Sequence, residues 1–589
     1  MNSIGKVLKE PLQHCTIMVE WIETDVLVVG GGLAGCRAAI EAAESGVETV
    51  IVDRGTIGRF GATNCALWSI QAPFGPRGVD PRDSPEQMFK DIVIYGRWLG
   101  NQNVIEVIAN TACDRILDLE RYGVKFRKIE GDRFYQTPFP GQTYPRSVFV
   151  EENGHAVATI IAAEVARHEN VTMLNNFFTF ELLKSDGGVV GALGLDLTRG
   201  EVLGIKAKST ILACGGYTGI WDLTDNPPTL TGAHIAMSYR VGAELVNLEF
   251  NDFYGTDLVW PPSVKGTVVL YELLAPQFTD GNLYDKDWKP ILPKPLPVRD
   301  EAMRMIYQVI REGRGTPHGG VWYDVTRSPK GKDEVRKIYE TMTPKHYEFI
   351  KKAAGIDLVE EPIEVAPAVH YSSGGVYINE RCEASIPGLY AAGESAGGYQ
   401  GANRLAGMGL AAAHTLGAQA GKHAALRAKE ISSIEVPTEQ VKKAEERIES
   451  YLKHKSQPIT PSSLKKQIRQ IVGRTLAPIR NAQMLEKGLN EILMLKEKAL
   501  PKVEVPDTRA FNLALMEALE AELMLDTAEL AIRCAIFRKE SRGHHYREDY
   551  PKMDDKNWRK QTIIVMERGE PKIFLRPPTY TKLFPPEVS

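Results

Sequence analysis

The first clear hydrophobic pattern of the chain lies near its N-terminus. Residues 25–29 form an apolar run that stops at Gly30, which predicts a buried parallel strand. Residues 33–45 are rich in alanine with apolar residues at helical spacing, and Gly46 is placed to cap this helix. Residues 48–53 predict a second strand. Strand, helix and strand in this order predict a right-handed βαβ unit.

The hydrophobic pattern of the later segments predicts further strands, a loop-rich insertion, a helical segment and an extended tail. Residues 209–216 and 388–394 predict two more strands, each followed or preceded by glycine. Residues 255–296 are rich in proline, glycine and aromatic residues without clear periodicity, which predicts loops of an inserted domain. Leucine, alanine, glutamate and lysine dominate residues 435–540 and predict helices, whereas residues 541–589 predict extended structure along the surface.

Composition narrows the class of protein. The chain has 589 residues, 43% of them hydrophobic and 25% charged, which is typical of a globular protein of several domains. A net charge of −4 gives no electrostatic reason to expect nucleic-acid binding. The seven cysteines are scattered singly, so we expect no metal site or conventional iron–sulfur cluster held by this chain alone, and a reducing compartment. We see no apolar run long enough to span a membrane and no signal peptide, and expect a cytoplasmic protein.

The turn after the first strand matches the dinucleotide-binding pattern G-x-G-x-x-G. Gly30 permits the tight turn, Gly32 lets a pyrophosphate approach the backbone, and Gly35 lets helix and strand pack closely. Asp53 ends the second strand, where an acid binds ribose hydroxyls. A glycine-rich loop without a nucleotide is the structural alternative. A downstream strand that ends at Glu394 favours FAD over NAD.

Several separated motifs together resemble the flavoprotein subunits of succinate dehydrogenase and fumarate reductase, with L-aspartate oxidase and the alpha subunit of adenylylsulfate reductase as relatives. The resemblance covers nearly the whole chain. The motifs that carry it are residues 30–35, 210–216, 370–375, 389–394, 401–405 and 540–547.

This resemblance implies an α/β fold with a Rossmann-type FAD-binding domain, an inserted α+β capping domain and a C-terminal helical domain. It also implies electron exchange with a separate iron–sulfur subunit. The expected division is an N-terminal arm (1–23), the FAD-binding domain in two parts (24–239 and 366–430), the capping domain (240–365), the helical domain (431–540) and an extended tail (541–589).

The resemblance also implies the residues that contact the flavin. Glu394 is expected at the ribityl chain. No histidine occurs in residues 59–65, where respiratory members carry the histidine that bonds to FAD, so we expect the cofactor to be non-covalent. The expected FAD-binding residues are Gly30, Gly32, Leu33, Ala34, Gly35, Asp53, Arg54, Gly61, Ala62, Thr63, Ala213, Gly215, Glu394, Asn403 and Leu410.

The resemblance places the chemistry on a few polar residues. Arg299 matches the arginine that gives a proton to the substrate, and His370 and Arg404 match ligands of a substrate carboxylate. The structural alternatives are a surface ion pair of Arg299 with Asp300 or Glu301, a core histidine and a buried structural arginine. Glu272 is expected to act as a proton relay beside Arg299.

Two departures change the expected pocket. Tyr254 stands where the family has a substrate-binding histidine, and it keeps a hydrogen-bond donor but cannot carry positive charge. Ala275 stands where the relay arginine is found, so Glu272 lacks that partner. We therefore expect a small carboxylate substrate that differs from plain fumarate or succinate.

Three functions remain open at this point. The first is C=C reduction, or its reverse, on a carboxylate. The second is a sulfur enzyme similar to adenylylsulfate reductase, suggested by residues 311–315. The third is a non-catalytic electron-transfer subunit of a larger complex. The cations of residues 538–547 fit either a solvated face or a clamp between domains or to a partner.

Overall fold

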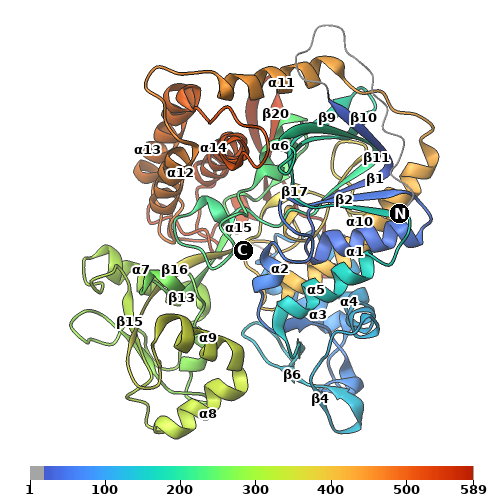
Figure 1. Cartoon of the computed structure of the whole chain (residues 1–589). Coiled ribbons are helices and arrows are strands. Elements are labelled where there is room, and N and C mark those ends of the chain that lie inside the picture. Colours follow the sequence, from blue (N-terminus) through green and yellow to red (C-terminus); the bar gives the residue numbers. More distant parts are fainter. Residues whose placement is uncertain (1–18, 588–589) are drawn as a thin grey trace.

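The computed structural model describes residues 19–587 (Figure 1). Strand β1 (Glu20–Val29) begins before the predicted strand. The last residues of the predicted N-terminal arm (1–23) therefore belong to the sheet, and the predicted limit of the arm is wrong. Residues 1–18 of that arm lie outside the described residues. Strand β1 begins this early because β11 (Glu201–Leu212) pairs with it in parallel from Glu20 onward.

A seven-stranded sheet forms the centre of the larger lobe. Six of its strands have the order β8-β2-β1-β11-β10-β9, and the seventh, β18, also pairs with β11. The predicted βαβ unit is confirmed as β1, α1 (Leu33–Glu44) and β2 (Thr49–Val52), with β1 and β2 parallel. The remaining strands of the sheet are β8 (Val171–Leu174), β9 (Phe177–Ser185), β10 (Gly188–Asp196) and β18 (Leu389–Ala391).

Helices cover this sheet and bury its apolar strands. Helix α1 packs against α10 (Met408–Glu430) and α5 (Asn153–Val165). Because β2, β1, β11 and β18 run in parallel, their carboxyl ends meet at one edge, which is where such sheets bind ligands. Other elements of this lobe are α2 (Ala62–Cys65), α3 (Pro85–Tyr95), α4 (Gln102–Tyr122), α6 (Ala233–Arg240), β3 (Ser69–Gln71), β4 (Lys128–Ile129), β5 (Arg133–Phe134), β6 (Gln136–Thr137) and β7 (Ser147–Phe149).

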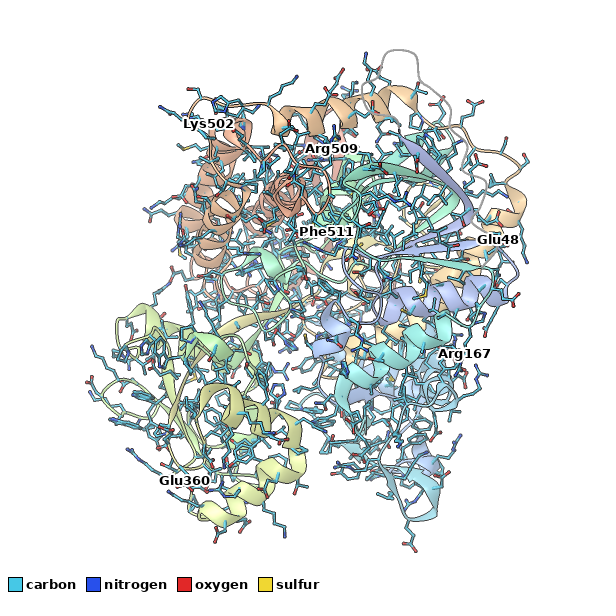
Figure 2. All side chains as sticks on the ribbon, in the orientation of Figure 1. Glu48, Arg167, Glu360, Lys502, Arg509 and Phe511 are labelled. Atoms are coloured by element: carbon cyan, nitrogen blue, oxygen red, sulfur yellow. The ribbon has the colours of Figure 1, made fainter. Side chains whose placement is uncertain are left out.

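A smaller lobe, formed by residues 251–372, lies apart from the sheet at the lower left of Figure 1. Its four-stranded antiparallel sheet has the order β13-β16-β15-β14. The strands are β13 (Asn251–Leu258), β14 (Asn282–Tyr284), β15 (Val321–Asp324) and β16 (Ile363–Ser372), and the helices are α7 (Arg299–Arg311), α8 (Lys332–Met342) and α9 (Pro344–Ala354). Glu360 lies at the outer end of this lobe in Figure 2.

The predicted helical segment is confirmed. It contains α11 (Thr438–Leu452), α12 (Pro461–Thr475), α13 (Ala482–Met494) and α14 (Leu513–Phe537). Helix α14 is apolar on most sides and largely buried, because α12 and α13 pack against it and α6 of the large lobe contacts it too. Figure 1 shows these helices in orange and red, beside the large lobe.

The C-terminal segment is not simply extended along the surface, and the prediction for residues 541–589 is wrong in this respect. Strands β20 (Gln561–Glu567) and β21 (Glu570–Arg576) form a hairpin. Strand β20 pairs with β12 (Leu245–Val246), and β17 (Gly375–Tyr377) and β19 (Ala396–Gly397) complete a five-stranded sheet. Local sequence could not show this pairing, because its partner strand lies some three hundred residues earlier.

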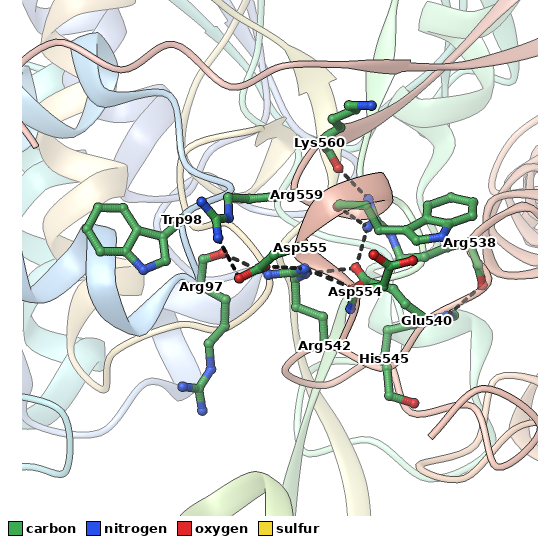
Figure 3. A network of polar contacts seen from close by, with 12 residues as sticks. Arg97, Trp98, Arg538, Glu540, Arg542, His545, Asp554, Asp555, Arg559 and Lys560 are labelled. Carbon is green, nitrogen blue, oxygen red and sulfur yellow. Dashed lines mark hydrogen bonds and ion pairs between the residues drawn. The ribbon is translucent and has the colours of Figure 1, made fainter. Parts of the chain in front are cut away.

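The cations of the tail form a buried network, which rules out a solvated face (Figure 3). Arg538 donates to Glu249 at 2.6 Å and to Glu540 at 2.8 Å. Arg542 donates to Glu540 at 2.8 Å and to Asp555 at 2.8 Å. Glu249 belongs to the segment before β13, so these bonds connect the end of α14 and the tail to the large lobe.

Removing one member of this network is expected to destabilise the protein. Arg538→Ala should lower the free energy of unfolding by about 3–5 kcal/mol, because Glu249 would stay buried without a cation and Glu540 would keep only Arg542. Denaturant unfolding measures the loss. The control is Arg167→Ala on the outer surface (Figure 2), which removes the exposed ion pair with Glu164 and should cost less than about 1 kcal/mol. Equal losses in both variants would contradict the structural role of the network.

Candidate functional site

A cavity of about 800 Å³ lies at the carboxyl edge of the large sheet and extends to the smaller lobe. Of the predicted site residues, Gly35 and Asn403 do not line it. Gly35 is a packing position, and Asn403 is buried with its side-chain oxygen accepting from the Arg404 amide at 3.1 Å. The others do line it: Gly30, Gly32, Leu33, Ala34, Asp53, Arg54, Gly61, Ala62, Thr63, Ala213, Gly215, Tyr254, Glu272, Arg299, His370, Glu394, Arg404 and Leu410.

The glycine turn between β1 and α1 has the geometry of a phosphate cradle. A Cβ on Gly30 would lie 2.2 Å from the Ala213 carbonyl oxygen, and one on Gly35 would lie 1.8 Å from the Gly30 carbonyl oxygen. At Gly32 the nearest atom, Thr63 Oγ1, is 3.4 Å away, so the protein leaves this position open. Gly32 also precedes the first residue of α1 without a side-chain cap. The helix N-terminus and the open position fit a pyrophosphate.

Asp53 holds the same turn in shape. Its carboxylate accepts from the Gly31 amide at 2.7 Å and from the Gly55 amide at 2.8 Å. Burial raises the pKa of Asp53, and the two amide bonds oppose that change. Asp53 therefore connects the glycine turn to the end of β2 while it lines the cavity.

The segment that would carry a covalent histidine lies directly against this turn. The Leu33 amide donates to Thr63 Oγ1 at 3.1 Å, which places the short helix α2 beside the start of α1. Gly61 has a φ of 84°, in the left-handed region that favours glycine, and turns the chain into α2. Ala62 lines the cavity and offers no nucleophile.

Glu394 lies between the glycine turn and the polar end of the cavity. It follows β18, and its Oε1 accepts from the Ser372 amide at 2.9 Å. Burial raises the pKa of Glu394 to about 7, and the Ser372 amide and Arg404 only partly oppose this. Glu394 therefore binds a proton far more readily than an exposed glutamate does.

This raised pKa predicts a pH dependence for the FAD-free protein. The folded value of about 7 lies above the ordinary value of 4.5, so the stability due to Glu394 is present below pH 4.5 and is lost as the pH rises to about 7. Glu394→Gln stays neutral and should be more stable than the wild type at pH 8, by about 3 kcal/mol, with no such gain near pH 4.5. Unfolding curves of both proteins across this range measure the difference; parallel curves would contradict the assignment.

Arg299, Glu272 and Tyr254 form a buried chain of hydrogen bonds in the smaller lobe. Arg299 is the first residue of α7, and its Nη2 donates to Glu272 Oε1 at 2.7 Å. The Tyr254 hydroxyl donates to Glu272 Oε2 and accepts from the Tyr271 amide at 3.1 Å. The guanidinium of Arg299 lies 4.9 Å from the centre of the Tyr254 ring.

The charges of this chain of hydrogen bonds are strongly coupled. Burial opposes the charge on Arg299, but Glu272 and its neighbours raise the pKa of Arg299 above the ordinary value. Burial would raise the pKa of Glu272, yet Arg299 and the Tyr254 hydroxyl together lower it. Arg299 is 9% exposed and bonds to Glu272 rather than to Asp300 or Glu301, so the surface-pair alternative is wrong.

Arg404 also lines the cavity and lies in the loop before α10, which begins at Met408. Arg404 donates to Asp252 at 3.2 Å and to the Leu405 carbonyl oxygen at 3.2 Å, while its Nε has no partner among the described residues. His544 Nε2 lies 2.8 Å from the other oxygen of Asp252. Burial would raise the pKa of Asp252, but His544 and Arg404 hold it well below its usual range.

His370 completes the polar end of the cavity. It lies in β16, and its Nδ1 contacts the carboxylate of Asp225. The side chain of Asn226 donates to the His370 carbonyl oxygen at 2.6 Å. Sequence reasoning missed Asp225, Asp252 and His544. The one local signal for Asp225 is the sequence Asp225-Asn226-Pro227, because Asp and Asn before proline are typical of turns.

The cations that suggested a sulfur enzyme do not belong to the cavity. Arg311 donates to Glu548 at 2.8 Å. Arg314 donates to Asp285 at 2.9 Å and to Glu312 at 2.8 Å, and it is 41% exposed. Neither arginine lines the cavity. The structural basis for that alternative is therefore absent from the described cavity.

Comparison with known proteins agrees with this arrangement. Residues 25–410 match the family described as FAD binding domain, and residues 465–589 match the one described as fumarate reductase flavoprotein C-term. A fumarate reductase (CoM/CoB) subunit from Methanothermobacter marburgensis is 36% identical over 95% of this chain and 100% of that protein. The succinate dehydrogenase flavoprotein subunit of Rickettsia bellii is 30% identical over 95% of this chain and 96% of that one.

A solved structure extends the likeness to three dimensions. The Mycobacterium smegmatis protein described as Sdh1 in complex with UQ1 superimposes with a TM-score of 0.87 at 29% identity, over 96% of both chains. None of the described helices of the present chain is both long and apolar enough to cross a bilayer.

The glycine turn, the parallel sheet and the cavity that joins two lobes define an FAD-dependent oxidoreductase with FAD-binding, capping and helical domains. The resemblance seen in the sequence is confirmed. The chain belongs to the fumarate reductase and succinate dehydrogenase flavoprotein family.

Proposed function

We propose that this oxidoreductase reduces an activated C=C bond of a small carboxylate substrate, or catalyses the reverse reaction. The observation that carries the proposal is the convergence of Arg299, His370 and Arg404, from three separate segments, on the cavity that contains the glycine turn. When bound, FAD supplies hydride transfer through its N5 atom. The residues of the chain supply binding, position and a proton.

Two residues are proposed to hold the substrate carboxylate. Arg404 lines the cavity, and a guanidinium can bind a carboxylate through two parallel bonds. His370 offers the ring nitrogen that does not face Asp225. Tyr254 is proposed to contact the substrate with its ring, because its hydroxyl already donates to Glu272.

Arg299 is proposed to give the proton. Its raised pKa means that it holds its proton against water, so the proton leaves only toward a strongly basic, carbanion-like carbon placed beside it. Glu272 then takes up a proton from solvent and passes it to Arg299 across the 2.7 Å hydrogen bond, which restores both groups. The Tyr254 hydroxyl supports Glu272 in the place of the missing relay arginine at Ala275.

The remaining assignments follow from the family and from the cavity. We propose that FAD binds without a covalent bond, because residues 59–65 contain no histidine, and that a separate iron–sulfur subunit exchanges electrons with it. The absence of a covalent bond favours reduction of the substrate. We propose a cytoplasmic protein, in which the six described cysteines are free thiols. The domain limits proposed from the sequence are kept with two exceptions: β1 begins inside the arm of residues 1–23, and β16 crosses the limit at residue 365.

The test is single-turnover oxidation of the reduced holoenzyme. The protein is reduced with dithionite and mixed in a stopped-flow instrument with fumarate, with unsaturated monocarboxylates and with adenylylsulfate. Reoxidation by at least one unsaturated acid, absent in Arg404→Ala, supports the proposal. Reoxidation by adenylylsulfate alone would replace it with the sulfur chemistry, and no response to any acid would leave an electron-transfer role.

A further inference from the structure

A buried carboxylate lies directly behind the imidazole of His370, and nothing in the proposed mechanism uses it. The Asp225 carboxylate contacts His370 Nδ1, and its side chain is 3% exposed while that of His370 is 30% exposed. A carboxylate accepts hydrogen bonds and does not donate them, so Nδ1 carries the proton. The second nitrogen, Nε2, has no partner among the described residues, and His370 lines the cavity.

The turn that carries Asp225 is fixed from several sides. The Thr224 hydroxyl donates to the Val369 carbonyl oxygen at 2.9 Å, and the Asn226 amide nitrogen donates to that hydroxyl at 3.1 Å. The side chain of Asn226 donates both to the His370 carbonyl oxygen at 2.6 Å and to Asp225 Oδ1 at 3.0 Å. Hydrogen bonds from Thr224 and Asn226 therefore hold the turn that carries Asp225 against Val369 and His370 of β16.

The smaller lobe also packs on this turn. A Cβ on Gly266 would lie 2.4 Å from the Thr224 carbonyl oxygen, so the loop after β13 closely covers the segment before Asp225. Asp257 of β13 is fully buried, and burial first, then Asp225, raises its pKa well above the ordinary value. Asp225 is the carboxyl group that contacts the imidazole of His370.

We propose that Asp225 is the positioning residue of the substrate-binding histidine. Its carboxylate fixes the ring of His370 and keeps the Nδ1 proton in place, so that Nε2 faces the substrate carboxylate together with Arg404. A histidine whose second nitrogen is fixed by a carboxylate is a recurrent way to set tautomer and orientation. This inference rests on the proposed function, since it assigns the partner of one of its carboxylate ligands.

The test is a double-mutant cycle on the FAD-loaded protein, read by the change in flavin absorbance when fumarate, succinate or an unsaturated monocarboxylate binds. Asp225→Ala should raise the dissociation constant about tenfold, as His370→Ala does, and the double variant should be no worse than His370→Ala alone. Asp225→Asn retains an oxygen that can accept from Nδ1, and should lose less than Asp225→Ala.

Controls separate positioning from general stability. Asp526 is also paired, with Arg240 at 2.6 Å and Lys496 at 2.7 Å, and its side chain is 14% exposed, but it does not line the cavity. Asp526→Asn should change the unfolding temperature without changing the dissociation constant. Asp225→Ala should also bind FAD as tightly as the wild type does. If Asp225 only stabilised the structure beside the cavity, its loss would be expected to weaken FAD binding as well.

Each outcome decides the question. Wild-type affinity in Asp225→Ala, or losses in the two single variants that add in the double variant, would overturn the positioning role while the proposed function stands. A wild-type protein that binds FAD but none of the carboxylates would overturn the proposed function, and the positioning role with it.

Discussion

Gly32→Asp is expected to give a folded protein that purifies without the yellow colour of flavin. Gly32 has a φ of −80°, which any residue adopts, and its nearest neighbour leaves room for a side chain. The new carboxylate would lie at the N-terminus of α1, where we expect the phosphates of FAD, and would repel them. The affinity for FAD should fall at least about 100-fold, or by about 2.7 kcal/mol. Titration of the FAD-free protein with FAD measures this.

Two variants of the same turn serve as controls. Gly32→Ala adds a methyl group without charge, and should lose much less affinity than Gly32→Asp. Gly35→Ala should instead fail to fold normally, because its Cβ would lie 1.8 Å from the Gly30 carbonyl oxygen. A yellow Gly32→Asp protein with full FAD content would show that the phosphates bind elsewhere.

Arg299→Gln is expected to abolish turnover while FAD remains bound. Glutamine keeps a donor for Glu272 but cannot give a proton to a carbon atom. Loss of general acid catalysis should lower kcat by about 10³-fold, which corresponds to about 4 kcal/mol. Dye-linked assays with the substrate found in the stopped-flow panel measure kcat, and the flavin spectrum reports on the cofactor.

The matched control for this variant lies one turn further along the same helix. Arg304 pairs with Asp300 at 3.3 Å and does not line the cavity. Arg304→Gln should therefore keep the activity of the wild type. If Arg299→Gln retained a tenth or more of that activity, the proton would have to come from another group.

The parts of the fold that depend on neighbouring residues could be predicted from the sequence. The βαβ unit needs an apolar run, a helical repeat and glycines within one short segment, and β1, α1 and β2 appear as expected. Local signals also mark the start of α7 at Arg299, because a proline precedes Val298 and two acids follow the arginine. The motif matches placed Arg404, His370 and Glu272 in one cavity.

The rest depends on contacts between distant segments. Asp225 and His370 are separated by 145 positions, and no local periodicity connects them. Asp252 contacts both Arg404 and His544, and these three residues come from three different parts of the chain. The tail hairpin was missed for the same reason. The pairing partner of the hairpin, β12, is a two-residue strand without a pattern of its own.

The pairing of β20 with β12 has a consequence for how this protein is made. Residues 245 and 246 leave the ribosome long before Ile563 and Ile564, with which they pair. The five-stranded sheet and the arginine network around Arg538 therefore form only after synthesis is almost finished. Until then the strand edges and apolar faces that the tail will cover remain exposed to chaperones, so a premature stop a few dozen residues from the end would yield an aggregation-prone chain rather than a slightly shorter enzyme.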